Sequence, residues 1–439
     1  MKNFSIQYPF AVMCFCVMAA AFCSCHSAVK PKEEAAAEKQ VQKKDTFILP
    51  APGKLQDKEK QRIYEACRQW FDSSLATTVF NGGVLVAQKG NIIFEKYRGN
   101  LHLNGTDEIK ASTPFHIASV TKTFTAMAVL KLWQDGKLQL DDELNKYFPA
   151  FNYPGVTVRC LLNHRSGLPN YVYFLERMGW NQARPVSNRD VLDFLISNRS
   201  AMADISAACS HFSYCNTNYA LLALLIEKVS GSSYPQFMQQ QFFEPLHMND
   251  TYVLSIADSS KATPSYDWRG DEIPMNYLDF VYGDKNIYST PRDLLKWDRL
   301  LSSGVLFKPE TLEQAYAPYS NEKPGIRNYG LGWRMNIYDN GKKLIFHNGW
   351  WHGNNSAFTR LIDEDVTLIA VNNRFTRATY HINQLSNIFS NYFVPAEEDT
   401  DASVKDSSKK TSADSSSALK DSASAVKISP LKPARKRRA

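Results

Sequence analysis

The alternation of apolar and polar residues divides this chain into two strand-rich ends and a helical middle. Residues 82–99, "GGVLVAQKGNIIFEKYRG", hold two β-rich runs around Lys89-Gly90-Asn91, a pattern typical of a hairpin. Strand patterns return after residue 325 in "YGLGWRMNIYDNGKKLIFHNGW", "SAFTRLIDED" and "VTLIAVNN". We therefore expect strands from both ends of the folded region to build one antiparallel sheet.

Helical spacing of the apolar residues dominates the region between about residues 120 and 300. Gly136, Gly231 and Gly304 stand just after three helical runs, where glycine commonly ends a helix. Further helices are predicted around Gln56–Ser74 and in the late segment "HINQLSNIFSNYF". The predicted fold class is mixed α/β, with helices flanking the sheet and an inserted all-α lobe.

The two ends of the chain differ from this region in composition. Lys2 precedes an apolar stretch, Phe10–Phe22, that is short for a membrane span and typical of a signal peptide. Cys25 follows in a context resembling a relaxed bacterial lipoprotein cleavage site, which would make it the lipidated first residue. The alternative is an ordinary signal peptide, or cleavage before Cys23. We expect an exported protein of the cell envelope, either periplasmic or membrane-anchored.

These patterns give four predicted parts. Residues 1–25 form the signal peptide, 26–50 a flexible tether, 51–395 the folded domain, and 396–439 a disordered tail poor in aromatic residues.

Composition and charge narrow the class of protein. The chain has 439 residues, 44% of them hydrophobic, which is enough for a sizeable core. Its net charge of +7 belongs mainly to the two ends. A nucleic-acid-binding protein needs a concentrated basic face in its folded part. We therefore expect no nucleic-acid partner, and the sequence does not indicate the oligomeric state.

Four cysteines fall within the predicted domain: Cys67, Cys160, Cys209 and Cys215. They allow three connectivities, and small buried thiols are an equally good interpretation. No Cys-x-x-Cys zinc spacing occurs, and His347 and His352 lack a third ligand at usable spacing. We expect neither a metal nor another cofactor.

The first candidate for chemistry is "SVTK", which places Ser119 three residues before Lys122 at the start of an apolar helix. One helical turn separates such residues, so the amine can activate the serine hydroxyl as a nucleophile. Seven Ser-x-x-Lys strings occur in the chain, so the spacing alone carries little weight. The alternative is an N-cap serine with an exposed lysine.

The second candidate is "YCN", with Tyr214 and Asn216 just before a strongly apolar helix. In an extended segment, residues two apart point the same way, so both side chains can face one cleft. A tyrosine near a lysine ammonium group can act as a general base. The alternative is a half-buried tyrosine with Asn216 or Thr217 capping the helix.

The third candidate is "HNG", where a strand delivers His347, Asn348 and Gly349. Glycine allows a substrate to approach the strand edge closely. His347 could donate a hydrogen bond to a substrate, although a histidine at a strand end is more often structural.

In this order, "SVTK" at 119–122, "YCN" at 214–216 and "HNG" at 347–349 resemble the serine β-lactamase/penicillin-binding-protein superfamily. The resemblance is nearest to its class C β-lactamase and DD-peptidase/esterase branch. Flanking segments such as "FHIASVTKTFTA" and "YGLGW" also look like family segments, and the resemblance spans about residues 55–395. It implies a β-lactamase/transpeptidase-like fold.

The resemblance also implies roles for single residues. Ser119 matches the acylated nucleophile, Lys122 the amine that helps activate it, and Tyr214 the general base. Asn216 matches the amide that orients the substrate and Lys122. His347 matches the strand position that contacts the substrate.

The resemblance implies that the same strand carries the remaining parts of the site. Gly349 belongs to this substrate-binding motif, and the backbone N–H of Trp350 matches the second donor of the oxyanion hole. Trp350 and Trp351 are bulky at this place. They are predicted to line an apolar acyl pocket with four further aromatic residues, or else to pack at the sheet edge. Those four are Tyr171, Tyr173, Phe174 and Trp180.

The expected function is an exported serine hydrolase that forms an acyl-enzyme on an amide or ester bond of a small molecule or peptide. A D-amino-acid peptide of cell-wall origin fits best, because true β-lactamases usually carry lysine where this chain has His347. The alternatives are a true β-lactamase and a binding or sensor protein that does not turn over. The membrane is expected as a partner through the lipid anchor.

Overall fold

The computed structural model describes residues 46–202 and 206–392. The chain divides into two units, and the first of these, Met1–Lys43, lies outside the described residues. The predicted signal peptide with Cys25, most of the predicted tether and the predicted tail also lie outside the described residues. Their assignments stay predictions, and everything below concerns the second unit.

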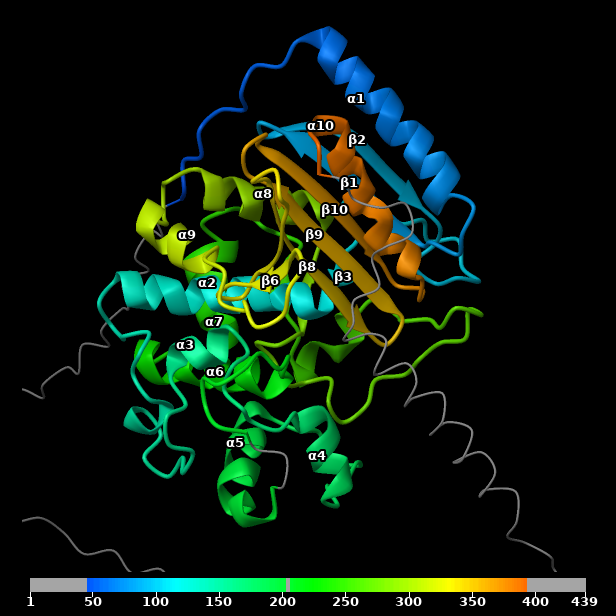
Figure 1. Cartoon of the computed structure of the whole chain (residues 1–439). Coiled ribbons are helices and arrows are strands. Elements are labelled where there is room, and N and C mark those ends of the chain that lie inside the picture. The colour runs from blue at the N-terminus through cyan, green and yellow to red at the C-terminus, as the bar shows by residue number, and fades with distance from the viewer. Residues whose placement is uncertain (1–45, 203–205, 393–439) are drawn as a thin grey trace, which may run out of the picture. The chain divides into compact units, whose positions relative to one another are not determined.

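A seven-stranded antiparallel sheet, in the order β2-β1-β10-β9-β8-β7-β6, forms the frame of the domain (Figure 1). Strand β1 from the start of the domain pairs with β10 from its end, with Gly82 opposite Asn372. The sheet is therefore built from both ends of the domain, as predicted. Its strands are β1 (Gly82–Gln88), β2 (Asn91–Arg98), β6 (Arg327–Tyr329), β7 (Arg334–Ile337), β8 (Lys343–Trp351), β9 (Asn354–Leu361) and β10 (Val366–Asn372).

The β1–β2 connection has the chemistry that a tight hairpin needs. Lys89 and Gly90 both adopt positive φ angles, 50° and 74°. Two consecutive left-handed residues are the mark of a type I′ turn, whose twist matches that of the flanking strands. The hairpin read from the sequence is confirmed.

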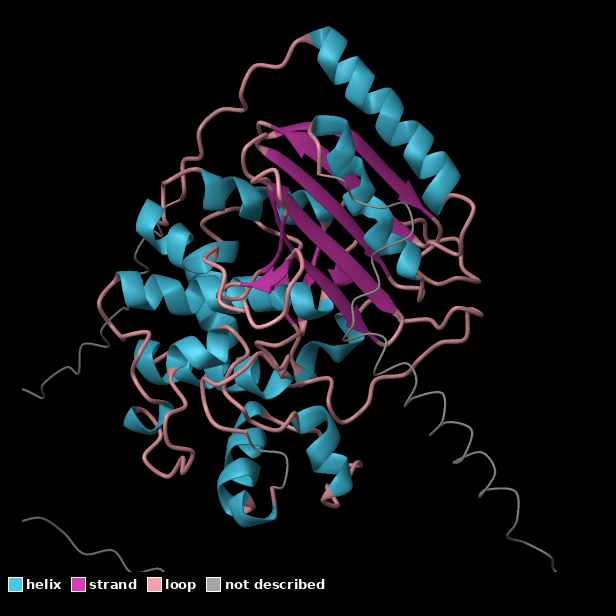
Figure 2. Ribbon diagram, viewed as in Figure 1, coloured by secondary structure: helices cyan, strands magenta, loops and turns pink. Residues whose placement is uncertain are grey.

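Alternating residues of the central strands enter two separate cores. Val84 and Leu368 pack with the first core, under α1 (Asp57–Trp70) and η7 (Arg377–Leu385). Their neighbours Leu85 and Ile369 pack with the second, larger core, which contains the helical region. Figures 1 and 2 show helices on both faces of the sheet. Period-two alternation thus buries both faces of these strands.

The helical region between β2 and β6 contains most of the remaining elements. Its first long helix, α2 (Thr121–Gln134), is buried over nearly its whole length, and α6 (Asn216–Ser230) packs against it. Gly136, Gly231 and Gly304 have φ angles of 71°, 74° and 69°, which confirms the predicted left-handed helix ends. The other helices of this region are η2 (Ala118–Val120), η3 (Leu144–Lys146), α3 (Val158–Leu162), α4 (Tyr171–Arg177), α5 (Asn188–Ser197), η4 (Arg199–Ala201), α7 (Tyr234–Met238), η5 (Gln239–Phe243), η6 (Ile256–Lys261), α8 (Pro291–Ser302) and α9 (Pro309–Ala315).

Two further short helices complete the described part of the domain: η1 (Phe71–Leu75) extends α1, and α10 (Ser386–Phe389) follows η7. Helix α1 with η1 matches the predicted Gln56–Ser74 helix closely. The late helix is mainly a 3-10 helix rather than a regular α-helix.

The inserted lobe is not purely helical. A small three-stranded sheet, in the order β3-β5-β4, takes two of its strands from within residues 120–300. Tyr252 lies opposite Tyr288 in this sheet, and their rings stack 5.3 Å apart. Strands of two or three residues are too short to give a periodic signal in a sequence. Their bounds are β3 (Phe115–His116), β4 (Tyr252–Val253) and β5 (Ile287–Ser289).

The structure shows how the four cysteines of the domain are paired. Cys160 and Cys209 are joined, whereas Cys67 and Cys215 are buried free thiols. Both interpretations left open by the sequence therefore apply, each to one pair of cysteines. Packing also begins before residue 51, because the backbone N–H of Phe47 donates to the carbonyl of Pro245 at 3.0 Å.

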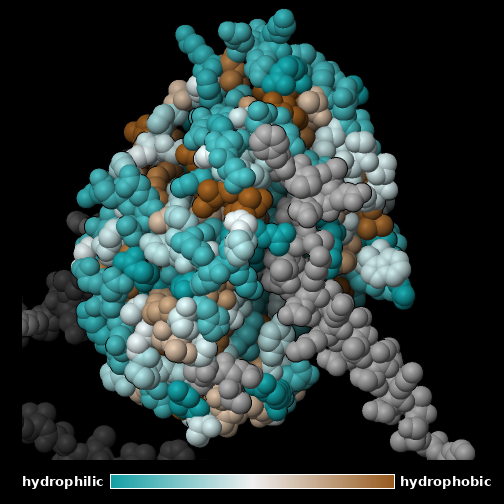
Figure 3. Space-filling view, in the orientation of Figure 1, coloured by the Kyte–Doolittle hydropathy of each residue, from teal (hydrophilic) through white to brown (hydrophobic). Residues whose placement is uncertain are grey.

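The surface drawn in Figure 3 is mainly hydrophilic, with hydrophobic residues in small separate patches. Within residues 46–202 and 206–392, no helix combines the length and the apolar character needed to span a bilayer.

Candidate active site

Ser119 and Lys122 meet at the start of α2. Ser119 lies in the 3-10 turn η2, and Lys122 is the second residue of the helix that follows. The Lys122 Nζ donates to the Ser119 Oγ at 3.1 Å. The one-turn spacing read from the sequence thus becomes a direct contact.

The surroundings of Lys122 exclude the alternative of an N-cap serine with an exposed lysine. Lys122 is completely buried, and Ser119 makes no capping bond for α2. Its Nζ also donates to Asn216 Oδ1 at 2.9 Å and to the backbone carbonyl of Asp284 at 2.7 Å. An ammonium group has three N–H donors, so these acceptors compensate for its removal from water. The free-energy cost of burying a lysine is offset only where partners compensate its charge or where that charge serves the function.

The backbone around Ser119 is held in an unusual conformation. Ala118 has a φ angle of 46°, the left-handed region that alanine seldom adopts, and its N–H donates to His116 Nδ1. Ser356 Oγ donates to the Ile117 carbonyl at 2.6 Å. Such strain persists only where the surrounding structure enforces it, and it is frequent at active sites. Here it turns the chain from β3 into the helix and sets the position of Ser119.

Gly349 allows β8 to approach this turn. A Cβ atom on Gly349 would lie 2.4 Å from the Ile117 carbonyl oxygen and 3.0 Å from the backbone nitrogen of Ser119. β8 pairs with β7 only as far as Phe346, so on this edge the end of β8 lies beside η2, while its other edge stays paired with β9. Only glycine fits this contact between the third motif and the nucleophile.

The second motif enters from the start of α6. Tyr214 lies beside Lys122, whose Nζ is 5.0 Å from the centre of its ring. Asn216 binds the same ammonium group, and Cys215 between them has extended backbone angles. The expectation that Tyr214 and Asn216 face one site is therefore met. Thr217 donates to the carbonyl of Pro169 and does not cap the helix.

His347 is present at this site but is turned into the protein. The side chain is completely buried, with Nδ1 2.7 Å from the Asn348 carbonyl and Nε2 3.2 Å from the Tyr329 hydroxyl. A carbonyl only accepts, so Nδ1 carries the proton and Nε2 accepts from Tyr329. Burial, together with the charges of Arg334 and Lys122, lowers the pKa of His347 well below its ordinary value. His347 is thus neutral, and its role as a direct donor to substrate stays a prediction.

The predicted aromatic acyl pocket is only partly assembled. A cavity of about 250 Å³ is lined by Tyr214 together with Tyr173 and Phe174. Trp351 instead donates through Nε1 to Asp279, and Trp350 donates through Nε1 to the carbonyl of His352 at 2.8 Å. The two tryptophans therefore follow the alternative, packing at the end of the sheet. The role of the Trp350 backbone N–H as an oxyanion donor stays a prediction.

Several residues of this site carry no motif and were missed by sequence reasoning. His164 packs against Tyr214 with ring centres 4.3 Å apart and ring planes inclined by 39°, and its Nδ1 accepts from the Cys215 N–H. Arg334 places its guanidinium carbon 4.9 Å from the centre of the Tyr214 ring. Asp284 holds Lys122 through its backbone carbonyl. The only signals available were the flanking segments "LLNHRSGLP", "GDKNIYST" and "YGLGW", which do not reveal single roles.

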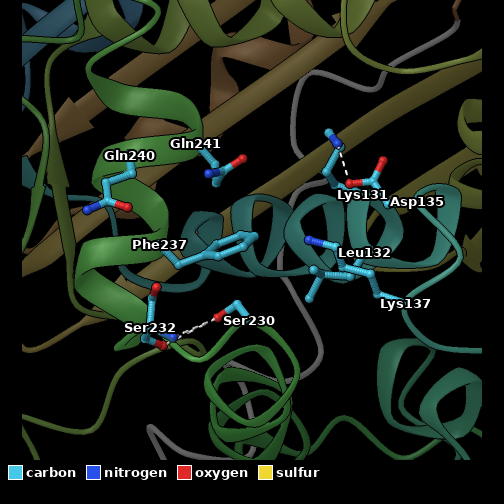
Figure 4. Close-up of a pocket in the computed structure, with 9 residues that line it drawn as sticks. All are labelled: Lys131, Leu132, Asp135, Lys137, Ser230, Ser232, Phe237, Gln240 and Gln241. Carbon is cyan, nitrogen blue, oxygen red and sulfur yellow. Dashed lines mark hydrogen bonds and ion pairs between the residues drawn. The ribbon is translucent and has the colours of Figure 1, made fainter. Parts of the chain in front are cut away.

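The far end of α2 carries a second, smaller hollow of about 90 Å³ (Figure 4). Lys131 and Asp135 form an ion pair at its edge, while Phe237 and Gln241 approach from α7 and η5. None of the candidate catalytic residues lines it. In the part of the chain that the structure describes, no group of three or more His, Cys, Asp or Glu side chains is placed to hold a metal ion.

The fold and this site together define a class of protein. A serine hydroxyl at a helix start, a buried lysine bonded to it, and a tyrosine beside that lysine form the arrangement of a serine hydrolase with a lysine partner.

The family follows from comparison with known proteins. The sequence profile of the Beta-lactamase family matches residues 68–390, so this chain belongs to that family. Penicillin-binding protein 4* of Bacillus subtilis (strain 168) is 31% identical over 312 residues, which cover 67% of this chain and 68% of that protein. Relatives from Staphylococcus aureus at 26% identity are covered over only 54% of their length. The chain is a serine hydrolase of the serine β-lactamase/penicillin-binding-protein superfamily, as the sequence motifs predicted.

Solved structures share the fold. The octameric penicillin-binding protein homologue from Pyrococcus abyssi superimposes with a TM-score of 0.64 at 23% identity, over 74% of this chain and 76% of that one. The D-amino acid amidase from Ochrobactrum anthropi SV3 gives 0.61 at 23% identity, over 74% of this chain and 97% of that one. These similarities confirm the mixed α/β fold class.

Proposed function

We propose that this protein hydrolyses an amide or ester bond through an acyl-enzyme formed on Ser119. The observation that carries the proposal is the bond from Lys122 Nζ to Ser119 Oγ, 3.1 Å long and made by a completely buried lysine. A surface lysine beside a serine would need no explanation. A buried one with Asn216 and the Asp284 carbonyl as further acceptors is suited to a reaction centre.

The proposed reaction has two halves. Ser119 Oγ attacks the carbonyl carbon, and its proton passes to the phenolate oxygen of Tyr214, which the neighbouring Lys122 ammonium group stabilises. The bond to the leaving amine or alcohol then breaks, and Tyr214 returns the proton to that group. A water molecule then attacks the acyl carbon and gives a proton to the same base. The bond from that carbon to Ser119 Oγ breaks, and the proton passes to Oγ, which releases the acid and restores the hydroxyl. The positive charges of Lys122 and Arg334 beside the Tyr214 ring favour its proton-accepting form.

The substrate class we favour is a peptide that ends in a free carboxylate, with a D-amino acid at the scissile bond. Neutral, buried His347 does not provide a cation for that carboxylate. Arg334 does, because its guanidinium group lies beside Tyr214. The name of the similar D-amino acid amidase agrees with a D-amino acid at the scissile bond.

A fluorophosphonate probe tests the acyl-enzyme directly. We expect the intact protein to gain one adduct at Ser119 and the Ser119→Ala variant to gain none. Equal labelling of the two proteins would refute the proposal. A D-Ala-D-Ala peptide, a p-nitrophenyl ester and a chromogenic cephalosporin then separate peptidase, esterase and β-lactamase activity. Rapid turnover of the cephalosporin alone would replace the peptidase assignment, whereas a single burst without turnover would indicate a sensor.

Arg334→Gln tests the choice of substrate. We expect its KM to rise about tenfold or more for the carboxylate peptide and to stay nearly unchanged for an ester without a carboxylate. Equal effects on both substrates would show that Arg334 acts on the site and not on the carboxylate.

We also propose that the protein is exported and anchored through a lipid on Cys25. The apolar segment Phe10–Phe22 and the position of Cys25 support this. Radiolabelled fatty acid should enter the full chain and should not enter the Cys25→Ala variant. Equal incorporation would contradict the anchor.

A further inference from the structure

A second buried lysine lies beside the catalytic centre. The Lys285 Nζ donates to the Tyr171 hydroxyl and lies 3.6 Å from Asp284 Oδ2, and both charged side chains are buried. The ammonium group is also 4.6 Å from the centre of the Trp351 ring and 5.0 Å from that of Tyr171. Tyr171 OH donates in turn to Asp284 Oδ2 at 2.9 Å. A buried ion pair of this kind adds little to stability, so its place beside the reaction centre calls for another reason.

The segment that carries this ion pair is hydrogen-bonded to α2 at three positions. The Gly283 carbonyl accepts from Thr125 Oγ1 at 2.7 Å, and the Ile287 N–H donates to Thr121 Oγ1 at 3.2 Å. Between them, the Asp284 carbonyl accepts from Lys122 Nζ at 2.7 Å. One residue, Asp284, therefore contacts both ammonium groups, Lys122 through its backbone and Lys285 through its carboxylate.

The charges around the two lysines are unequal. Lys285 has the carboxylates of Asp284 and Asp279 as neighbours, and the latter also accepts from His352 Nε2 at 2.9 Å. The side-chain atoms that accept from Lys122 Nζ, which are Ser119 Oγ and Asn216 Oδ1, belong to neutral groups. Burial lowers the pKa of Lys285, and the two carboxylates oppose this effect. The other titratable or charged groups facing the pair of lysines are Tyr171, Tyr214, Tyr219, His116, His164, His347, Cys215 and Arg334.

We propose that Lys285 is a positioning residue of this active site, whose buried positive charge biases the base of the acylation step toward its deprotonated form. Asp284 and Tyr171 hold the charge in place, and the Asp284 carbonyl fixes Lys122 beside it. The inference rests on the acyl-enzyme function proposed above. Lys285 also supplies, from another segment of the chain, a positive charge that the neutral His347 does not supply.

The direction of the effect is the same for either proton acceptor. A nearby cation disfavours protonation of the Lys122 amine, and it favours the phenolate of Tyr214 over the phenol. Both effects lower the apparent pKa of the base. Removing Lys285 must therefore raise that apparent pKa, whereas removing Asp284 must lower it.

The rate of fluorophosphonate labelling of Ser119, measured in the full chain from about pH 5 to 10, tests this. For Lys285→Met we expect the apparent pKa of labelling to rise by about one unit. Labelling at pH 7 then slows about tenfold, while the plateau at high pH is retained. For Asp284→Asn we expect a shift of opposite sign, which keeps the test decisive if one variant does not fold.

Arg360→Met is the matched control. Arg360 is another buried cation, paired with Asp298 away from the serine, and its loss should lower the melting temperature without moving the apparent pKa. An unchanged apparent pKa in both Lys285→Met and Asp284→Asn would overturn the inference and leave the acyl-enzyme function intact. Shifts of the same sign in the two variants would also overturn it. A wild-type protein that is not labelled at all would refute the acyl-enzyme function and the inference together.

Discussion

Helix α2 carries a lysine near each end, and the two lysines have different surroundings. Lys122 is completely buried and donates to Ser119 and Asn216. Lys131 is partly exposed and forms an ion pair with Asp135 one turn further along, as Figure 4 shows. The same residue type on the same helix thus serves as part of a reaction centre at one end and as an ordinary surface pair at the other.

The two lysines differ in where along the chain their partners come from. Lys131 has a carboxylate partner four residues further on, directly after the end of α2, and this requires no other segment of the chain. Lys122 needs acceptors from α6 and from the loop before β5, which are 94 and 162 residues away in the sequence. Its environment therefore depends on the whole helical region being folded around it.

Replacing Lys122 with methionine should have the largest effect. We expect acylation of Ser119 to slow by at least about 1000-fold, because the serine loses the partner that activates it. The melting temperature should change little, since the lost hydrogen bonds are offset by removal of a buried charge. Stopped-flow labelling and calorimetry measure the two quantities. Retained labelling would show that Lys122 is structural.

Gly349→Ala should have the next largest effect, on the order of a 100-fold loss of activity. The new Cβ would lie 2.3 Å from Ser356 Oγ and 2.4 Å from the Ile117 carbonyl oxygen, so β8 or the Ser119 turn must move. We expect about 1–3 kcal/mol of lost stability from this overpacking.

Gly136→Ala, at the far end of α2, is the control for Gly349→Ala. A Cβ there meets nothing within 4 Å, and only the positive φ angle of 71° is unfavourable. It should cost about 1 kcal/mol and leave activity unchanged. Equal activity losses in the two variants, from steady-state assays, would contradict the role of the close approach.

The buried histidines near the Ser119 end should make stability depend on pH. Burial lowers the pKa of His116 to about 3, and it lowers the pKa of His164 and His347 well below their ordinary values. These histidines are neutral in the folded state and take up protons on unfolding below pH 6.5, so stability falls as the pH falls. Each contributes up to about 1.4 kcal/mol per pH unit. Urea unfolding at several pH values measures the slope, and His347→Gln should reduce it. A flat profile from pH 6.5 to 5 would refute this assignment.

Lys131→Met should have the smallest effect. The pair with Asp135 is an i,i+4 contact on a partly exposed surface, so its loss should change the free energy of unfolding by about 0.5 kcal/mol or less. Activity should equal that of the wild type. A large loss of activity would mean that the two ends of α2 are coupled and that Lys131 is not an ordinary surface residue.

Much of the fold could be predicted from the sequence because its signals are local. The Lys89-Gly90 hairpin and the helix ends at Gly136, Gly231 and Gly304 all appeared where turn and cap chemistry placed them. The short strands β4 and β5 were missed, because two or three residues carry no period. The pairing of Cys160 with Cys209 could not be deduced either, since spacing does not select among three connectivities.

The order of the three motifs, and therefore the family, could be predicted from the sequence alone, because motif identity is a property of residue types along the chain. The sequence placed Ser119 and Lys122 one helical turn apart for the same reason. The burial of Lys122, the inward orientation of His347 onto Tyr329, and the positive charge that Arg334 and Lys285 bring to the site became visible in the folded chain alone. These properties depend on which distant segments surround a side chain, since burial and charge act through space and not along the sequence.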